Sequence, residues 1–119
     1  MTALVLVPRS ELLEAASQHI SETMERSPNE QAVLGVFAGL IIKAANWDAT
    51  DRDDQEAAIR LAAYVMAGFV EYLLFRGHLQ SPEQPVGRWL RRQSVRDIAA
   101  ALADAAAFWR SLENWESPW

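Results

Sequence analysis

The first candidate for chemistry in this chain is a short basic segment that also contains a tryptophan. An indole and four guanidinium groups lie within nine residues of a chain whose net charge is −5: Arg88, Trp89, Arg91, Arg92 and Arg96. Arginine and tryptophan dominate the hot spots of protein interfaces, and a guanidinium group can also hold phosphate or stack on bases. The alternative is intramolecular, with the arginines neutralising acidic helices and Trp89 closing the end of the core. Both interpretations are open on the sequence alone.

An acidic segment is the second candidate. Its five carboxylates are Asp48, Asp51, Asp53, Asp54 and Glu56. Their spacing is similar to the start of a calcium loop, but an EF-hand needs glycine at its sixth position and glutamate at its twelfth. Counted from Asp51, these positions hold Glu56 and Ala62, so the match fails. The segment is either a solvated loop that caps the next helix or an acidic patch that docks on an arginine- and lysine-rich surface of another protein.

Tryptophans near the end of the chain form the third candidate. Trp115 and Trp119 follow the last expected helix, where an exposed indole is unfavourable. They either fold back onto the protein or bury against another chain. Trp109 falls on the apolar stripe of the last helix, so we expect it in the core.

No catalytic, cofactor or metal motif stands out. The chain has no cysteine, which excludes disulfides and thiolate metal sites. His19 and Glu22 lie three residues apart and could present two metal ligands, but no third ligand is evident, so we expect His19 to face solvent. Phosphate-binding loops, zinc-protease motifs and nucleophile elbows are absent. The sequence therefore assigns no catalytic residue, cofactor or metal, and leaves the question of an enzyme open.

Helices must position these segments, and two stretches are apolar almost all the way round a helix. Residues 32–42 carry no charge, and residues 61–75 carry only Glu71. Such helices must be buried by neighbours, so we expect them to form the centre of a bundle whose core a second subunit or a partner helps to complete. Within the first stretch Ala32, Gly35 and Gly39 would let another helix approach closely, usually as plain packing.

No segment in this interpretation spans a membrane. The eleven residues of 32–42 fall short of the roughly 20 that a membrane-spanning helix needs. The opening of the chain lacks the features of a secretory signal. We expect a cytoplasmic protein without membrane contacts.

Capping signals delimit four main helices. Ser27 and Glu30 form a capping box, and Ser94 with Asp97 resembles one. Gly77 is a natural helix stop. The expected helices cover residues 10–26 with Ser10 as N-cap, 28–46, 53–76 and 95–113.

These elements predict one all-α domain over residues 1–119, an antiparallel bundle of four main helices. Residues 82–93, which contain Pro82, Pro85 and Gly87, form either a loop or a short fifth helix. We expect residues 1–9 to be an extended N-terminal arm, because valines favour strand and Pro8 keeps Val7 out of the helical region. Residues 114–119 are expected to be an aromatic C-terminal tail.

Charge narrows the functional classes. An acidic chain does not suit non-specific nucleic-acid binding, which needs a basic footprint, and suits basic partners better. Our leading hypothesis is a non-enzymatic protein-interaction module, a small acidic inhibitor or adaptor that binds another protein and self-associates. Toxin-immunity proteins and phage-encoded antagonists of host protein complexes are one class of this size and charge.

Two other functions stay open. The first is a small-molecule-binding or enzymatic bundle with a pocket between the central helices, using Tyr64, Glu71, Tyr72 or His78 as polar groups. The second is nucleic-acid contact through residues 88–96, which predicts binding that weakens steeply with salt.

Overall fold

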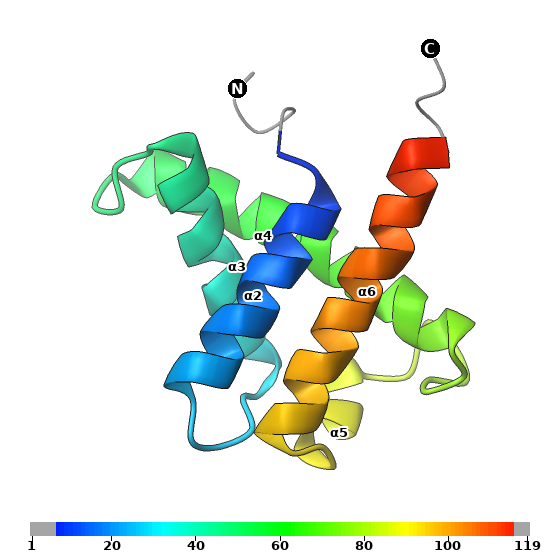
Figure 1. Ribbon diagram of the computed structural model, residues 1–119. Coiled ribbons are helices and arrows are strands. Elements are labelled where there is room, and N and C mark those ends of the chain that lie inside the picture. The colour runs from blue at the N-terminus through cyan, green and yellow to red at the C-terminus, as the bar shows by residue number, and fades with distance from the viewer. Residues whose placement is uncertain (1–6, 116–119) are drawn as a thin grey trace.

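The protein is an all-α bundle, shown by a computed structural model that describes residues 7–115. Within that range the helices are α2 (Arg9–Thr23), α3 (Glu30–Ala45), α4 (Arg52–Phe75), α5 (Val86–Arg91) and α6 (Val95–Trp115). Helix α2 lies between α3 and α6, which both run antiparallel to it, and α4 crosses behind them (Figure 1). The predicted all-α class is confirmed, and α5 is the short fifth helix within 82–93.

The most extensive packing joins α2 and α6. Leu13 on α2 and Leu102 on α6 have no exposed surface, and small residues such as Ala105 are buried beside them. Small side chains on facing helices allow the backbones to approach closely. This closeness lets the buried Ser17 hydroxyl donate a 2.6 Å hydrogen bond to the Ala99 carbonyl oxygen, which satisfies both groups away from water.

Helix α4 packs against α2, α3 and α6. Its length and composition would also allow it to cross a membrane: an 18-residue window has a mean hydropathy of 1.6, with 44% of the window buried inside the protein. Of the described helices, α4 is long and apolar enough to cross a membrane, whereas the 32–42 stretch is too short. Phe69 and Leu73 have no exposed surface, and the core helix of a bundle needs the same apolar composition. The composition is therefore weak evidence for a membrane span.

Helix α3 lies at the edge of the bundle, so the prediction that residues 32–42 are enclosed on every side is wrong. Its fully buried residues are Val33, Phe37 and Ile41, whereas Gly35 and Gly39 are exposed. The physical reason is that glycine places almost no apolar surface in water. A helix can therefore lack charge without being surrounded by neighbours.

The start of α2 differs from the prediction in a way that involves the far end of the chain. The helix begins at Arg9, after Pro8, and ends at Thr23 rather than near residue 26. Ser10 is not the N-cap: its hydroxyl and its backbone N–H donate to the Glu113 carboxylate at 2.6 and 3.3 Å. A side chain from α6 thus supplies the negative charge that a helix N-terminus favours.

The predicted capping box at residues 27–30 is also wrong. The N-cap of α3 is Asn29, whose side-chain oxygen accepts a 2.8 Å hydrogen bond from the Ala32 N–H, and the helix begins at Glu30. The Ser27 hydroxyl instead donates to the Gln93 carbonyl oxygen, just before α6. Asparagine and serine cap helices about equally well, so cap preference alone does not separate Ser27 from Asn29, and the Ser27 hydroxyl is taken by its tertiary contact with Gln93.

Three other boundary signals are confirmed. The acidic segment caps the next helix, as one of its two interpretations expects: Asp51 accepts a 3.0 Å hydrogen bond from the Asp54 N–H, and α4 begins at Arg52, one residue before the expected start. Gly77 adopts a φ of +79°, which is the left-handed conformation expected just after a helix. Ser94 accepts a 3.0 Å hydrogen bond from the Asp97 N–H at the start of α6.

The predicted end segments are only partly covered by the structure. Most of the arm at 1–9, and Trp119 in the tail, lie outside the described residues. Arg9 belongs to α2 and not to an arm, and α6 continues through Trp115, so residues 114–115 are helical rather than the start of a tail.

Candidate functional site

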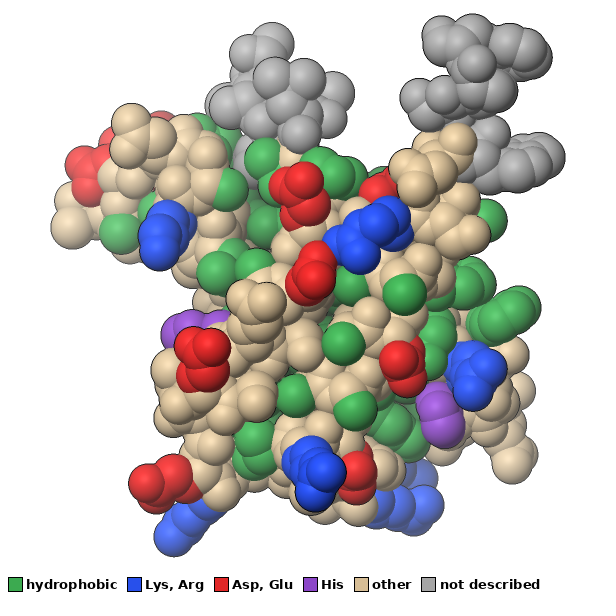
Figure 2. All heavy atoms as spheres, in the orientation of Figure 1, with side chains coloured by type: hydrophobic (Ala, Val, Ile, Leu, Met, Phe, Trp, Pro, Cys, Tyr) green, Lys and Arg blue, Asp and Glu red, His purple; other side chains and the backbone are tan. Residues whose placement is uncertain are grey.

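The four arginines of the basic segment form one corner of the molecule. All of them are exposed, three at α5 and one in the first turn of α6. Figure 2 shows basic side chains gathered at the end where α5 lies. Buried Val86 and Leu90 anchor α5 to the core, so the guanidinium groups project from a fixed support. We call this corner the arginine surface: Arg88, Arg91, Arg92 and Arg96.

The guanidinium groups of the arginine surface make no ion pair or hydrogen bond with any residue from 7 to 115. The ion pairs in that range join Arg52 to Glu56 and Arg110 to Glu14. Carboxylates do lie nearby: the Glu30 carboxylate is 3.7 Å from the position of an added Cβ on Gly87, and Glu22 lines a shallow hollow together with Arg96. The intramolecular and the intermolecular interpretations therefore both stay open. Exposed guanidinium groups without partners are free to meet an anionic surface.

Trp89 points the other way, into the protein. It is half-buried, with its ring centroid 6.1 Å from that of Phe69 at an interplanar angle of 73°. The His78 ring lies 5.7 Å from it on another side. Edge-to-face aromatic packing of this kind stabilises a core beyond the area that it buries. Trp89 therefore closes the end of the core and, through its contact with Phe69, holds the helix that carries Arg88 and Arg91 in place.

The acidic segment is organised largely by hydrogen bonds within its own loop. Asp48 accepts from the Thr50 hydroxyl at 2.7 Å and from the Thr50 N–H at 2.9 Å. Asp54 accepts from the Asp48 N–H at 3.0 Å, and Asp51 caps α4. The Thr50 hydroxyl, and then its N–H, hold the pKa of Asp48 below its usual value. These contacts agree with the solvated, helix-capping interpretation of the segment.

The rest of the acidic segment is exposed at the start of α4. Glu56 pairs with Arg52 across one helical turn, with 3.4 Å between the nitrogen and the oxygen, and Asp53 is exposed. Acidic side chains gather at the corner next to the start of α4, far from the arginine surface (Figure 2). The protein thus carries its two charged surfaces at different ends.

Trp109 is half-buried rather than enclosed in the core. Its indole Nε1 donates a 2.9 Å hydrogen bond to the Gly68 carbonyl oxygen. Arg9 lies against its ring, with the guanidinium carbon 4.2 Å from the ring centroid. Trp115 ends α6, and Trp119 lies beyond the described residues, so their role in partner binding stays a prediction.

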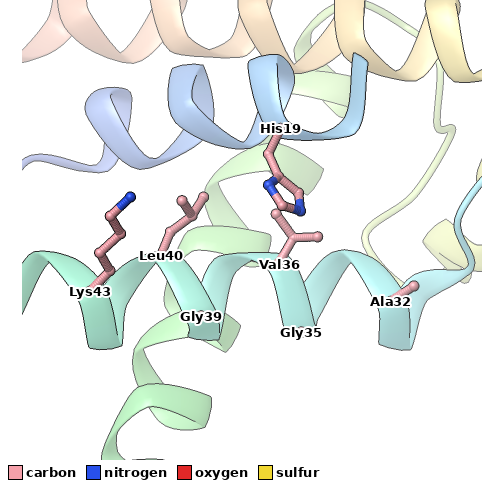
Figure 3. Close-up of a pocket in the computed structure, with 7 residues that line it drawn as sticks. All are labelled: His19, Ala32, Gly35, Val36, Gly39, Leu40 and Lys43. Carbon is pink, nitrogen blue, oxygen red and sulfur yellow. The ribbon is translucent and has the colours of Figure 1, made fainter. Parts of the chain in front are cut away.

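A groove between α2 and α3 was not predicted. Its main part has a volume of about 430 Å³, and Figure 3 shows the His19 imidazole reaching from α2 toward Val36 on α3. A second part of about 390 Å³ shares Leu40 and Lys43 with the first and continues to Glu11 near the start of α2. The remaining lining of the main part is provided by α3: Ala32, Gly35 and Gly39.

The glycines beside this groove have open space around them. An added Cβ at Gly35 or at Gly39 would meet no atom within 4 Å. The sequence indicates that small residues on this helix admit a close neighbour, usually one from the same chain. No helix formed by residues 7–115 packs closely on Gly35 or Gly39.

The polar residues of the predicted pocket do not converge on one site. Glu71 and His78 are exposed, and Tyr64 lies against Arg9. Tyr72 is buried with its ring 5.7 Å from that of Phe108. Burial raises the pKa of Tyr72, and the negative charge of Asp104 raises it further.

The residues from 7 to 115 contain no group of three or more histidine, aspartate and glutamate side chains placed to hold a metal ion. His19 is exposed, as expected. Comparison with known proteins finds no match to a family model, a curated protein or a solved structure. Functional inference therefore depends on the surfaces of the protein itself.

Proposed function

We propose that this protein is a non-enzymatic protein-interaction module, an inhibitor or adaptor that binds an acidic region of another protein through the arginine surface. The observation that carries this proposal is the set of exposed guanidinium groups on one corner, without ion pairs to residues 7–115. A basic partner would have to dock on the acidic segment instead, where Asp48, Asp51 and Asp54 already accept hydrogen bonds from the loop.

The arginine surface forms no ion pair with any residue from 7 to 115. Like charges that lie close together repel one another, and this repulsion is relieved only when an anionic surface covers them. Guanidinium groups bind carboxylates through paired hydrogen bonds with defined geometry, so they also select a partner. Since buried Leu90 and half-buried Trp89 hold α5 on the core, little ordering of the surface is needed on binding.

Affinity capture from the host lysate with two charge-reversal variants tests this proposal. Arg91→Glu with Arg92→Glu reverses two charges on the arginine surface, and Arg60→Glu with Arg76→Glu reverses two exposed charges of α4. Circular dichroism first establishes that both variants fold. We expect one stoichiometric protein to co-purify with the wild type and the α4 variant, and to be lost from the Arg91/Arg92 variant. Equal capture by both variants would contradict the proposal.

The same surface could contact nucleic acid, and a direct measurement distinguishes this second function. The fluorescence anisotropy of labelled single-stranded RNA and of labelled duplex DNA, titrated with the protein at low salt, measures nucleic-acid binding. Binding by phosphate contacts weakens steeply as salt increases. Tight, salt-sensitive binding that the Arg91/Arg92 variant loses would favour nucleic acid over protein as the partner, whereas no binding at low salt would remove this alternative.

We also infer that the face of α3 that carries Gly35 and Gly39, beside the groove with α2, mediates self-association. Glycine inside an exposed helix costs about 1 kcal/mol relative to alanine, yet a Cβ at Gly35 or Gly39 would meet nothing within 4 Å. Packing inside the protomer therefore does not require glycine at these two positions. A second helix packed closely against them would require it, because a larger side chain would keep the two backbones apart. No charged residue lies between Gln31 and Lys43 along this helix, which suits an antiparallel pair related by a twofold axis.

Light scattering coupled to gel filtration tests the self-association. We expect the wild type to have twice the protomer mass and Gly39→Leu to have the protomer mass. Ala63→Leu, at an exposed position of α4, serves as the matched control and keeps the double mass. A wild type that stays at the protomer mass at high concentration would contradict this inference.

A further inference from the structure

Arg9 lies in an aromatic clamp built by three helices. Its guanidinium carbon is 3.8 Å from the Tyr64 ring centroid on α4 and 4.2 Å from the Trp109 ring centroid on α6. The backbone of Gly68 lies beneath the same side chain and accepts the Trp109 indole hydrogen bond. The cation is therefore held in place before any ligand arrives.

This cation has no counter-charge among residues 7–115. Arg9 forms no ion pair there, and its Nε is buried without a hydrogen-bond acceptor. Glu113 approaches the neighbouring residue, but both of its carboxylate oxygens accept from Ser10. Aromatic rings attract a cation, which offsets part of the cost of leaving water. They offer the Nε–H no ordinary acceptor, so a hydrogen-bond donor is left unsatisfied.

A small, partly open hollow adjoins the clamp. Its volume is about 50 Å³, and Arg9 and Tyr64 are the polar residues in a lining that is otherwise aliphatic. One water molecule needs roughly 10–15 Å³ of such space, so the hollow has room for a group the size of a carboxylate. The Tyr64 ring, the Trp109 ring and the Gly68 backbone all lie against the Arg9 side chain, and the hollow borders it as well.

We propose that the Arg9 clamp is a carboxylate-binding site. A carboxylate matches the planar fork of guanidinium donors, supplies the missing negative charge and is small enough for the hollow. It comes either from an acidic group of another molecule or from Glu116, which directly follows α6 in the sequence. The site lies at the start of α2, at the opposite end of the molecule from α5 (Figure 1), so it is independent of the arginine surface.

Nuclear magnetic resonance on the wild-type protein tests the site with acetate as the probe. The Arg9 Nε–H and Trp109 Nε1–H signals are followed during an acetate titration at constant ionic strength. The Nε–H signal of exposed Arg88 in the same spectra is the internal control. If the carboxylate comes from another molecule, we expect a saturable shift at Arg9 and Trp109 of the wild type, and none at Arg88.

A Glu116→Gln variant distinguishes the two sources of the carboxylate. If Glu116 occupies the clamp, acetate does not change the Arg9 Nε–H signal of the wild type. In the Glu116→Gln variant that signal lies at a different position from the wild-type signal, and it shifts again when acetate is added. If the ligand is external, wild type and variant respond alike. The proposal is overturned if Arg9 responds no more than Arg88 in both proteins.

Discussion

Gly68 lies directly under the Arg9 side chain: a Cβ on Gly68 would stand 2.3 Å from Arg9 Cδ and 2.8 Å from Arg9 Nη1. The absence of a side chain at this position of α4 is therefore a condition for the clamp. The Trp109 indole also reaches the Gly68 carbonyl oxygen, so one residue positions both the cation and one of its aromatic neighbours.

Gly68→Ala should therefore lower stability even though alanine is the better helix former. The methyl group would displace the end of the Arg9 side chain from the Tyr64 and Trp109 rings. Each lost cation–π contact costs about 0.5–1 kcal/mol at such a site, against a gain of about 1 kcal/mol in helix propensity, so we expect a net loss of up to about 1 kcal/mol in the free energy of unfolding. Urea denaturation followed by circular dichroism measures this change.

Gly35→Ala is the matched control for this substitution. Since a Cβ there meets no atom within 4 Å, helix propensity alone should raise the free energy of unfolding by up to about 1 kcal/mol in dilute solution. Equal stabilisation by both substitutions would show that Arg9 does not rest on Gly68.

Glu113→Ala should loosen the contact between the two ends of the described chain. It removes both acceptors of the Ser10 donors, and we expect a loss of about 1–2 kcal/mol in the free energy of unfolding. Glu14→Ala provides the comparison, because it breaks an exposed ion pair between the same two helices, α2 and α6. That substitution should cost less than about 1 kcal/mol. A double-mutant cycle with Ser10→Ala checks that Glu113 acts through Ser10.

Ser94→Ala should destabilise α6 at its first turn. The Ser94 hydroxyl accepts from the Asp97 N–H, and removing such a cap costs about 1 kcal/mol. Ser94→Asp retains an acceptor and should restore most of the loss. The melting temperatures of the Ser94→Ala and Ser94→Asp variants measure the contribution of the cap. Equal melting temperatures would mean that the hydrogen-bond acceptor at residue 94 contributes nothing to stability.

Tyr72 should make the protein sensitive to alkaline pH. Burial raises its pKa in the folded state, with a contribution from the charge of Asp104. The folded state therefore favours the protonated phenol, and this stabilisation is complete below the usual tyrosine value of about 10. It decreases as the pH rises above that value. Tyr72→Phe removes the effect, so chemical denaturation at increasing pH should show a smaller alkaline loss for this variant than for the wild type.

Local signals predicted much of the fold correctly. The caps at Asp51 and Ser94 and the stop at Gly77 depend on a few neighbouring residues, and the structure has all three. Among the site residues, composition pointed to the arginine surface. It could not separate the arginines from Trp89, because their opposite orientations depend on how α5 packs on Phe69.

Other features depend on contacts between distant parts of the chain. Ser10 and Glu113 are 103 residues apart, and nothing near Ser10 in the sequence indicates that its hydroxyl serves a distant carboxylate. The aromatic neighbours of Arg9 come from two other helices. The edge position of α3 could not be predicted either, because an uncharged run rich in glycine and alanine fits an enclosed helix and an exposed one equally well.

The hydrogen bonds between Ser10 and Glu113 also bring the start of the first described helix close to the end of the last one. The first and last described helices lie side by side along their length, and residues 9 and 115 lie toward the same end of the molecule (Figure 1). A peptide linker could join them while the exposed turn near Pro82 is opened to create new ends. The order of helices along the polypeptide would change, and their arrangement in space would not.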